Sequence, residues 1–367
     1  MNDTRTTAVN IEGESGASVP HFRLSVIVPA RNEAACLGEC LESLLAQSEP
    51  GFALGAQWEL IIVDDDSADA TPEIAQAAAA GREGVVVLQA PLLDLSDRGG
   101  FTGKTNACWA GAQKSRGAWL LFTDADTVHE PGDLSRAIHE AEKHHAALLS
   151  YSPRQILTGF WQHAVMPLVF SELASVYPPK QVSDPASRLA AANGQFLLVE
   201  REAYSSVGGH RRVGLEILED VALARAIKRA KHGIRFRYAP EALATRMYRT
   251  LPEMIEGWTK NLALLFPSPQ LLAAMQTLQL LLFFVLPLLV VGMPYLVSWQ
   301  RGAILLVWLR TSWGFYSRVA RSHFPATDVA ISILGIPMFV WLLIRSSLRH
   351  RLTKSVDWKG RSYKTGR

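Results

Sequence analysis

The first half of the chain alternates short, unbroken apolar runs with stretches in which apolar residues recur at helical spacing. The run at 24–28 (LSVIV) is typical of a buried strand, whereas Leu37, Leu41 and Leu44 recur at the spacing of one helix face. Alternating strands and helices predict an α/β fold, with a mostly parallel sheet covered by helices on both faces. The predicted strands are 24–28, 60–63, 85–88 and 119–123, and the predicted helices are 34–47, 71–81, 105–114 and 131–145.

The second half contains a long apolar stretch without charged side chains. Residues 261–300 include no Asp, Glu, Lys or Arg, and a bilayer crossing needs only about 20 predominantly apolar residues. We therefore expect this stretch to enter a membrane. Two further apolar stretches follow at 302–316 and 326–344, and Pro287 and Pro294 interrupt the first stretch. Two, three or four crossings are compatible with this pattern.

The charge is distributed unevenly along the chain. The 37 basic and 34 acidic residues give a net charge of +3, which is too balanced for a nucleic-acid-binding protein. The segment after residue 344 is strongly basic, which predicts that it lies on the cytoplasmic side of a membrane. Residues 1–20 are polar and contain no apolar core of a secretory signal. We therefore expect the N-terminal body in the cytoplasm too, which requires an even number of crossings.

Acidic side chains follow two of the predicted strands. Asp64 and Asp65 end one strand, and Asp124 and Asp126 follow another. Ligands of such sheets bind at the carboxyl ends of the strands. Residues i and i+2 of an extended segment point the same way, so Asp124 and Asp126 predict a site for Mg²⁺ or Mn²⁺, which also take substrate phosphates. The consecutive carboxylates at 64–66 are typical either of a solvated turn or of contact with a nucleobase, a ribose or a cation.

Two predicted helix starts carry further candidate chemistry. The glycine-rich segment 99–105 is not a Walker A motif, because Arg98 stands where its first glycine is needed. It still brings Lys104 to a helix N-terminus, which suits a diphosphate. Asp220, preceded by Glu219, opens another predicted helix. An aspartate at a cleft is suited to act as a general base, while the alternative is that both acids only complement the helix dipole.

Three other segments bear on an acceptor. Gln195 and His210 lie in turn-like segments that we expect to line an acceptor pocket. Residues 160–170 are apolar and aromatic, which fits either a core helix or an element that lies at a membrane surface.

In order, the segments VIVPARNE, IIVDDDSADAT, GKTNA, LFTDADT, NGQF, GGH, ILEDVALA and WKGR resemble the family 2 glycosyltransferases. The resemblance covers residues 25 to about 261. It implies a GT-A fold (a Rossmann-like αβα sandwich), a nucleotide-sugar donor and inversion at the anomeric carbon. The segment from Arg246 to Asn261 is most similar to the membrane-anchored branch that glycosylates carotenoids, hopanoids and related lipids. Processive synthases of the family carry Q/R-x-x-R-W, whereas Gly257 precedes Trp258 here, which favours transfer of a single sugar.

The resemblance also implies roles for individual residues. Asp65 matches the aspartate that contacts uracil, Asp124 and Asp126 match the metal and diphosphate motif, and Asp220 matches the catalytic base. It makes a UDP-sugar the expected donor and Mg²⁺ or Mn²⁺ the expected cofactor. The expected donor-binding residues are Pro29, Glu33, Asp64, Asp65, Lys104, Asp124, Arg246 and Arg249, and the expected acceptor-side residues are Gln195, His210, Glu219 and Trp258.

The sequence thus predicts an inverting hexosyltransferase that moves one sugar from a nucleotide-sugar to a hydroxyl of a membrane lipid. One alternative is transfer to a polyprenyl phosphate, to which Arg188, Arg211 and Arg212 would contribute positive charge. Another is a nucleotidyltransferase, for which Arg31 would have to serve a triphosphate loop. The expected protein is multi-pass in the cytoplasmic membrane, with its catalytic domain facing the cytoplasm. The expected parts are a flexible segment at 1–22, a GT-A domain at 23–265, a transmembrane region at 266–345 with two to four spans, and a basic cytoplasmic tail at 346–367.

Overall fold

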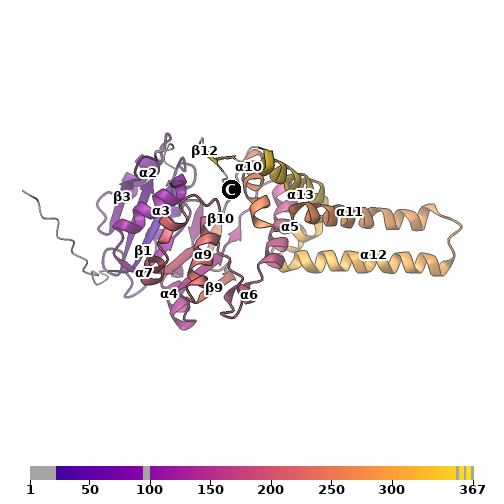
Figure 1. Ribbon diagram of the computed structural model, residues 1–367, viewed down its shortest axis with the longest axis horizontal. Coiled ribbons are helices and arrows are strands. Elements are labelled where there is room, and N and C mark those ends of the chain that lie inside the picture. The colour runs from indigo at the N-terminus through magenta and orange to yellow at the C-terminus, as the bar shows by residue number, and fades with distance from the viewer. Residues whose placement is uncertain (1–21, 94–99, 353–354, 359–360, 365–367) are drawn as a thin grey trace, which may run out of the picture.

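The computed structural model describes residues 22–93, 100–352, 355–358 and 361–364. The N-terminal segment up to residue 21, Arg98 and parts of the basic tail lie outside the described residues. Figure 1 shows a body built on a sheet at one end and a long helical hairpin that projects from the other end.

The body is organised around a seven-stranded sheet that is mostly parallel, as the sequence predicts. Its strand order is β3-β2-β1-β4-β8-β6-β9. The first four strands in this order run parallel to one another, and β8 is antiparallel to both of its neighbours. The strands are β1 (Phe22–Ala30), β2 (Trp58–Asp64), β3 (Val85–Gln89), β4 (Gly117–Phe122), β6 (Leu148–Ser152), β8 (Leu197–Glu200) and β9 (Ile234–Tyr238).

Helices cover both faces of the sheet because side chains alternate between its faces along each strand. In β1, Val26 packs into one apolar core with α1 (Leu37–Leu45) and α4 (Asp133–Lys143), whereas Ile27 packs into a second core with α3 (Gly103–Lys114) and α9 (Glu219–Arg229). The helices of the body are α1 (Leu37–Leu45), α2 (Thr71–Ala79), α3 (Gly103–Lys114), α4 (Asp133–Lys143), α6 (Pro179–Ser183), α7 (Arg201–Ser206), α8 (Gly209–Arg212) and α9 (Glu219–Arg229).

A small second sheet joins the body to a helical part. Its order is β5-β10-β7, formed by Thr127–His129, Leu243–Thr245 and Arg154–Gln155. The helical part has its own apolar core, which includes Met166, Trp258, Phe315, Ile336 and Phe339. Its elements are α5 (Phe160–Val176), α10 (Leu251–Leu265), α11 (Pro269–Gly292), α12 (Ser298–Val319), η1 (Ala320–Ser322) and α13 (Ala326–Leu352), followed by the β11–β12 pair (Ser355–Trp358 and Arg361–Lys364).

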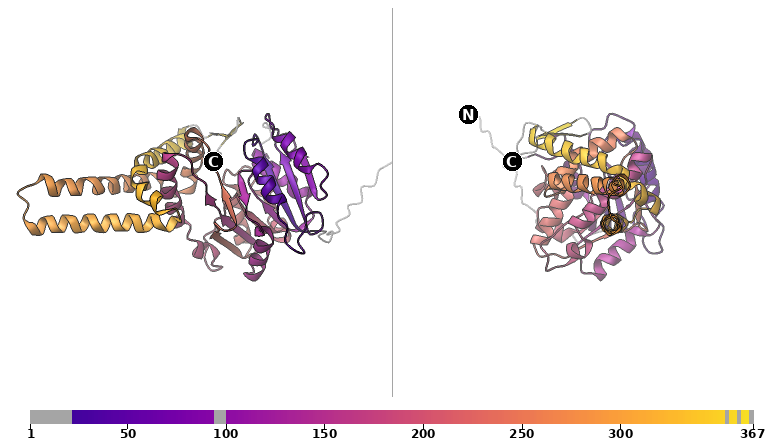
Figure 2. Two further views of the ribbon diagram at one scale, coloured as in Figure 1. Left: turned by 180° about the vertical axis from the view of Figure 1, so that it is seen from behind. Right: turned by 90° about the vertical axis from the view of Figure 1, so that its right-hand side faces the viewer.

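Helices α11 and α12 form the projecting hairpin (Figure 1). Within the described residues, α11 and α13 are long and apolar enough to cross a membrane, by length and composition. They differ in their surroundings, because only 6% of the most apolar window of α11 is buried, whereas 50% of that window of α13 is buried. Figure 2 shows that α13 runs across the base of the hairpin rather than along it. It packs there against α5, α10 and the base of α11.

Candidate active site

A cleft of about 600 Å³ opens at the carboxyl ends of β1, β2 and β4, where the first turns of α3 and α9 and one face of α10 also meet. Acids from distant parts of the chain, Asp65, Asp126 and Asp220, all line it. The structure brings most of the sequence-predicted site residues together here: Pro29, Glu33, Asp65, Lys104, Asp124, Asp126, Gln195, Glu219, Asp220, Arg246 and Arg249.

The three consecutive aspartates after β2 have separate surroundings. The buried Asp64 carboxylate accepts a hydrogen bond from the backbone N of Ser67 at 3.3 Å, which closes the loop. Asp65 lines the cleft. Asp66 has a positive φ of 58° and its exposed carboxylate lies 3.4 Å from Arg31 Nη1. Of these three, therefore, Asp65 is the one in position to contact a ligand, and Asp64 stabilises the loop.

Asp124 and Asp126 lie in a turn after β4, not in the extended segment that the sequence pattern suggested. Both nevertheless line the cleft, because side chains hold the backbone of the turn. Thr127 Oγ1 donates to the carbonyl of Asp124 at 2.7 Å, and Thr245 Oγ1 donates to the carbonyl of Asp126 at 3.2 Å.

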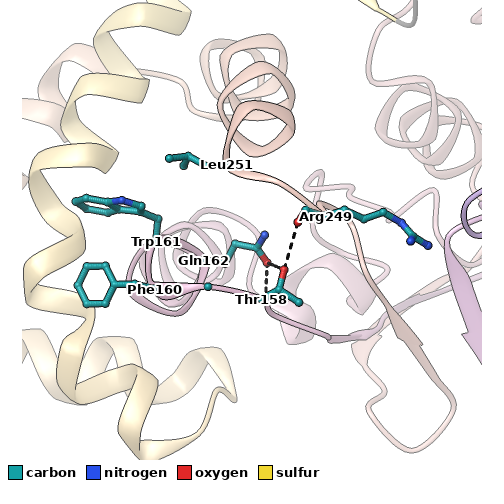
Figure 3. A pocket seen from close by; sticks show the side chains of 7 residues that line it. Thr158, Phe160, Trp161, Gln162, Arg249 and Leu251 are labelled. Atoms are coloured by element: carbon teal, nitrogen blue, oxygen red, sulfur yellow. Dashed lines mark hydrogen bonds between the residues drawn. The ribbon is translucent and has the colours of Figure 1, made fainter.

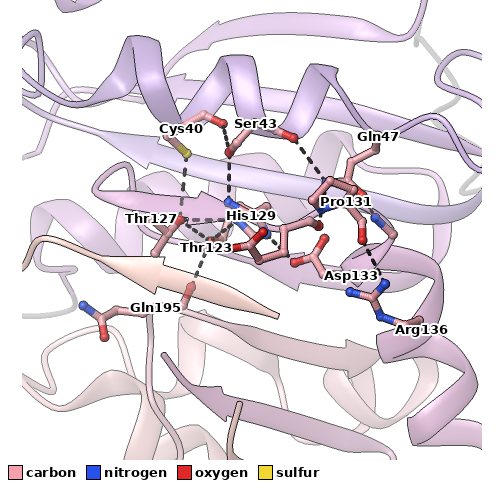
Figure 4. A network of polar contacts seen from close by, with 12 residues as sticks. Cys40, Ser43, Gln47, Thr123, Thr127, His129, Pro131, Asp133, Arg136 and Gln195 are labelled. Carbon is pink, nitrogen blue, oxygen red and sulfur yellow. Dashed lines mark hydrogen bonds and ion pairs between the residues drawn. The ribbon is translucent and has the colours of Figure 1, made fainter. Parts of the chain in front are cut away.

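A buried polar network supports this turn from below (Figure 4). His129 Nδ1 lies 2.6 Å from Asp133 Oδ2, and both side chains are fully buried. His129 Nε2 lies 3.0 Å from Thr123 Oγ1, which donates to the carbonyl of Gln195 at 2.8 Å. The network thus joins the start of the turn to a second cleft segment. His129 is a supporting residue here, because its ring nitrogens are both engaged inside the network.

Lys104 lies between the two acidic groups of the cleft. Its Nζ is 2.8 Å from Asp124 Oδ1 and 2.9 Å from Glu219 Oε1. Burial favours the neutral amine, but the carboxylates of Asp124 and Glu219 outweigh it and raise the pKa of Lys104 well above its usual value. Burial likewise opposes ionisation of Glu219, but the Lys104 ammonium lowers the pKa of that carboxyl. Both groups are therefore charged at neutral pH.

Asp220 has a different protonation behaviour from its neighbour. It lies in the first turn of α9, where Gly194 N donates to its Oδ2 at 2.8 Å and Val221 N donates to its Oδ1 at 2.7 Å. Burial and then the adjacent Glu219 carboxylate raise the pKa of Asp220 to about 7. A carboxylate with such a pKa can accept a proton near neutral pH, as a general base must.

Gly194 leaves space for the Lys104 ammonium in this arrangement. A Cβ at this position would lie 2.9 Å from Lys104 Nζ and 3.5 Å from Asp220 Oδ2. A side chain here would therefore push against the ammonium that neutralises the cleft acids.

One face of α10 contributes residues for which the sequence pattern predicts no role. Glu253, Glu256, Lys260 and Asn261 line the cleft. The spacing of three and four residues between Glu253, Glu256 and Lys260 was the available signal, since it places them on one side of a helix, opposite the buried Leu262. Burial lowers the pKa of Lys260 to about 8, although the carboxylate of Glu219 opposes the shift. Lys260 therefore keeps its positive charge at neutral pH.

His210 and Trp258, which were expected on the acceptor side, are not among the described residues that line the cleft. His210 is 1% exposed and packs against the rings of Phe122 and Tyr204. Its burial lowers its pKa to about 4, so the ring is neutral. Trp258 is 2% exposed and packs edge to face on Tyr248. Both side chains belong to the apolar interior behind the cleft.

The acids of the cleft fit a divalent cation only in combination with a substrate. Within the described residues, no group of three or more His, Cys, Asp or Glu side chains is arranged to hold a metal ion. Asp124 and Asp126 supply carboxylate oxygens, and Mg²⁺ commonly binds to one or two carboxylates together with substrate phosphates and water. The donor set therefore suits a cation that is shared with a diphosphate.

Comparison with known proteins agrees with this geometry. Residues 25–206 match the family described as glycosyl transferase family 2, a stretch that includes the turn with Asp124 and Asp126. The chain therefore contains a family 2 glycosyltransferase domain, and the protein is a glycosyltransferase.

Two similar curated proteins are both named 4,4'-diaponeurosporenoate glycosyltransferase. The one from Staphylococcus haemolyticus (strain JCSC1435) is 27% identical over 379 residues, which cover 96% of this chain and 90% of the relative. The one from Staphylococcus aureus (strain MRSA252) is 26% identical over 357 residues, which cover 94% and 88%. The similarity thus extends beyond the catalytic domain into the helical part.

Among solved structures, the chain is similar to the mannosyltransferase PcManGT from Pyrobaculum calidifontis in complex with GDP-Man and Mn²⁺. The TM-score is 0.50 at 15% sequence identity, and the match covers 94% of this chain and 92% of that chain. This similarity concerns the fold, and it confirms the predicted GT-A architecture.

Proposed function

We propose that the protein transfers a single sugar from a nucleotide-sugar to a hydroxyl of a membrane lipid, with inversion at the anomeric carbon. The observation that carries the proposal is the shared cleft, in which Asp220, with its pKa near neutrality, faces the same space as Asp65 and the Asp124–Asp126 turn. A nucleotide-sugar donor is supported by the complex of PcManGT with GDP-Man. A carotenoid-type acceptor is supported by the names of the two staphylococcal relatives.

In the proposed reaction, Asp220 accepts the proton of the acceptor hydroxyl. The oxygen then bonds to the anomeric carbon while the bond from that carbon to the diphosphate oxygen breaks, so one displacement inverts the centre. The leaving diphosphate carries the negative charge, which the Lys104 ammonium stabilises together with Arg246 and Arg249. A divalent cation held by Asp124 and Asp126 would add Lewis-acid stabilisation of the same leaving group.

Within this proposal the donor base lies near Asp65, beside Pro29 and Glu33. We propose uridine as the base and a hexose as the sugar, as the family resemblance implies. Released UDP, as opposed to pyrophosphate, distinguishes this reaction from nucleotidyl transfer.

The charge of the cleft bears on the acceptor. The name diaponeurosporenoate denotes a carboxylate, which needs no general base, whereas a neutral hydroxyl does. Asp220 lies directly beside the ionised Glu219, whose charge the Lys104 ammonium at 2.9 Å partly offsets. A polyprenyl phosphate would need positive charge near the acceptor group. The described lining of the cleft does not include Arg188, Arg211 or Arg212. These observations favour a neutral hydroxyl.

The pH dependence of transfer tests the role of the base. Asp220 acts in its ionised form, and its pKa is raised from 3.8 to about 7. We therefore expect kcat/KM for the lipid acceptor to fall about tenfold per pH unit below pH 7, instead of below pH 4. Glu219→Gln removes the neighbouring negative charge, so this acidic limb should move to lower pH. Measurements between pH 5 and 8 suffice, and a profile that is flat over this range contradicts the assignment.

We further propose that the α11–α12 hairpin crosses the membrane twice. Apolar side chains are exposed along both helices, including Leu281, Leu288 and Leu306. The 24 residues of α11 span about 36 Å and the 22 residues of α12 about 33 Å, enough for a hydrocarbon core of about 30 Å. α12 is the less apolar of the two, because it carries Arg310 within its span. We assign α13, which runs across the base of the hairpin and exposes Trp341 and Ile344, to the membrane surface. Two crossings keep the catalytic domain and the basic tail on one side, which we take to be the cytoplasm. Failure of the full chain to float with liposomes would contradict this assignment.

The function as a whole is tested by mass spectrometry of lipids from cells that contain the intact chain or its Asp220→Asn variant. We expect a lipid with one added hexose only with the intact chain. The same lipids in both samples would contradict the proposal, and addition of several sugars would contradict single transfer.

A further inference from the structure

A second hollow opens beside the reaction cleft, at the N-terminal end of α5 (Figure 3). It has a volume of about 260 Å³. Phe160 is 50% exposed and Trp161 is 38% exposed, and the two rings meet edge to face at 5.2 Å. The rest of α5 is used differently, since Val165 and Val169 are buried in the core of the helical part. The hollow is lined by Thr158, Gly159, Phe160, Trp161, Gln162, Arg249 and Leu251.

The hollow and the cleft share one wall. Arg249 lines both. On the side of the hollow its backbone carbonyl accepts a hydrogen bond from Thr158 Oγ1 at 3.5 Å. Its guanidinium points away from the hollow (Figure 3) and donates to the carbonyl of Ala35, a residue of the cleft. A ligand in the hollow would therefore contact a residue that also lines the cleft.

The polar groups of the hollow are largely occupied by one another. Gln162 Oε1 accepts from the backbone N of Thr158 at 2.8 Å, and Gln162 Nε2 donates to the carbonyl of Tyr248 at 3.2 Å. What the hollow offers to a ligand is the carbon surface of Phe160, Trp161 and Leu251. Such a surface accommodates an apolar chain and offers no partner to an anion.

We propose that this hollow binds the apolar chain of the lipid acceptor next to its reactive end, while the hydroxyl itself reaches Asp220 in the cleft. The proposal rests on the proposed function, because it takes the acceptor to be a lipid. The position of the hollow supports it. Phe160 and Trp161 begin α5, and one turn further His163 Nδ1 lies 3.0 Å from Asp328 Oδ1 of α13, the helix that we assign to the membrane surface. The lipid thus passes from the surface helix over two aromatic rings into the cleft.

Photolabelling of the full chain tests whether the hollow binds lipid, and it does not depend on catalytic turnover. The probe is 1-hexadecanol with a diazirine in its alkyl chain, presented in phosphatidylcholine vesicles, and mass spectrometry maps the labelled peptides. We expect label on the segments that hold Phe160, Trp161 and Leu251, and a loss of at least fivefold at these segments in Trp161→Ala. Label confined to α11 and α12, unchanged in Trp161→Ala, would overturn the proposal.

Steady-state kinetics give the second measurement. Trp161→Ala should raise KM for the lipid acceptor about tenfold, while the slow hydrolysis of the nucleotide-sugar by water keeps its rate and its KM for the donor. Trp341→Ala is the matched control, because Trp341 is 42% exposed on α13 and lies outside the hollow. An equal rise in KM in both variants would overturn the proposal, since it would reflect a general loss of apolar surface.

The two proposals fail in different ways. Label at the hollow without any glycosylated lipid would overturn the proposed function, but it would still show that the hollow binds lipid. Lipid glycosylation with an unchanged KM for the acceptor in Trp161→Ala would support the proposed function, but it would contradict binding of the acceptor chain in the hollow.

Discussion

Replacing Asp220 by Asn is expected to lower the rate of sugar transfer by about 10²- to 10⁴-fold, the usual contribution of general-base catalysis. The amide keeps the shape of the side chain, and its oxygen can still accept a hydrogen bond from the backbone N of Gly194, which now lies 2.8 Å from Asp220 Oδ2. It cannot accept the proton of the acceptor hydroxyl. The measurement is the initial rate of lipid glycosylation at saturating donor.

Binding of the nucleotide-sugar separates this chemical role from a structural one. We expect the dissociation constant of the donor to change by less than about threefold in Asp220→Asn, because the groups proposed to hold the diphosphate, Lys104 and Asp124, remain. Glu216→Gln is the matched control, since Glu216 is an exposed acid four residues earlier in the chain, and this variant should transfer at the normal rate. Near-normal transfer by Asp220→Asn would show that another group acts as the base, or that the acceptor is an anion.

The parallel half of the sheet was predictable because its signals are local. β1 and β2 are continuous apolar runs, and the predicted strands fall within or close to the observed Phe22–Ala30 and Trp58–Asp64. The same logic missed β8 (Leu197–Glu200), which has four residues and is antiparallel to both β4 and β6. Its place in the sheet is set by pairing with strands that are distant in sequence, and such pairing leaves no periodic pattern.

The acids of the cleft were predictable from topology alone. Carboxyl ends of parallel strands meet at one edge, so Asp65 and Asp124 had to lie at the same edge, with only β1 between the strands that they follow. His210 was expected at the acceptor pocket because it lies in a turn-like segment, but the ring packs against Phe122. The contribution of α10 was missed for the opposite reason. Its polar face looks like any solvated helix face until Lys260 is found in the cleft.

Removing divalent cations with EDTA is expected to abolish transfer, and addition of Mn²⁺ or Mg²⁺ should restore it. The reason is the charge balance of the leaving group. A departing nucleoside diphosphate carries more negative charge than Lys104 can neutralise, because its ammonium already lies 2.8 Å from Asp124 and 2.9 Å from Glu219. A second positive charge at the Asp124–Asp126 turn would supply what is missing.

Two variants show whether the Asp124–Asp126 turn or Lys104 is responsible for neutralising the diphosphate. Asp126→Asn should weaken binding of the donor in the presence of Mn²⁺ by about tenfold, and leave its binding in EDTA unchanged, as titration calorimetry can measure. Lys104→Met should weaken donor binding under both conditions, because its charge acts without a cation. Full activity in EDTA would instead mean that Lys104, Arg246 and Arg249 neutralise the diphosphate alone, and that Asp124 serves mainly to position the Lys104 ammonium.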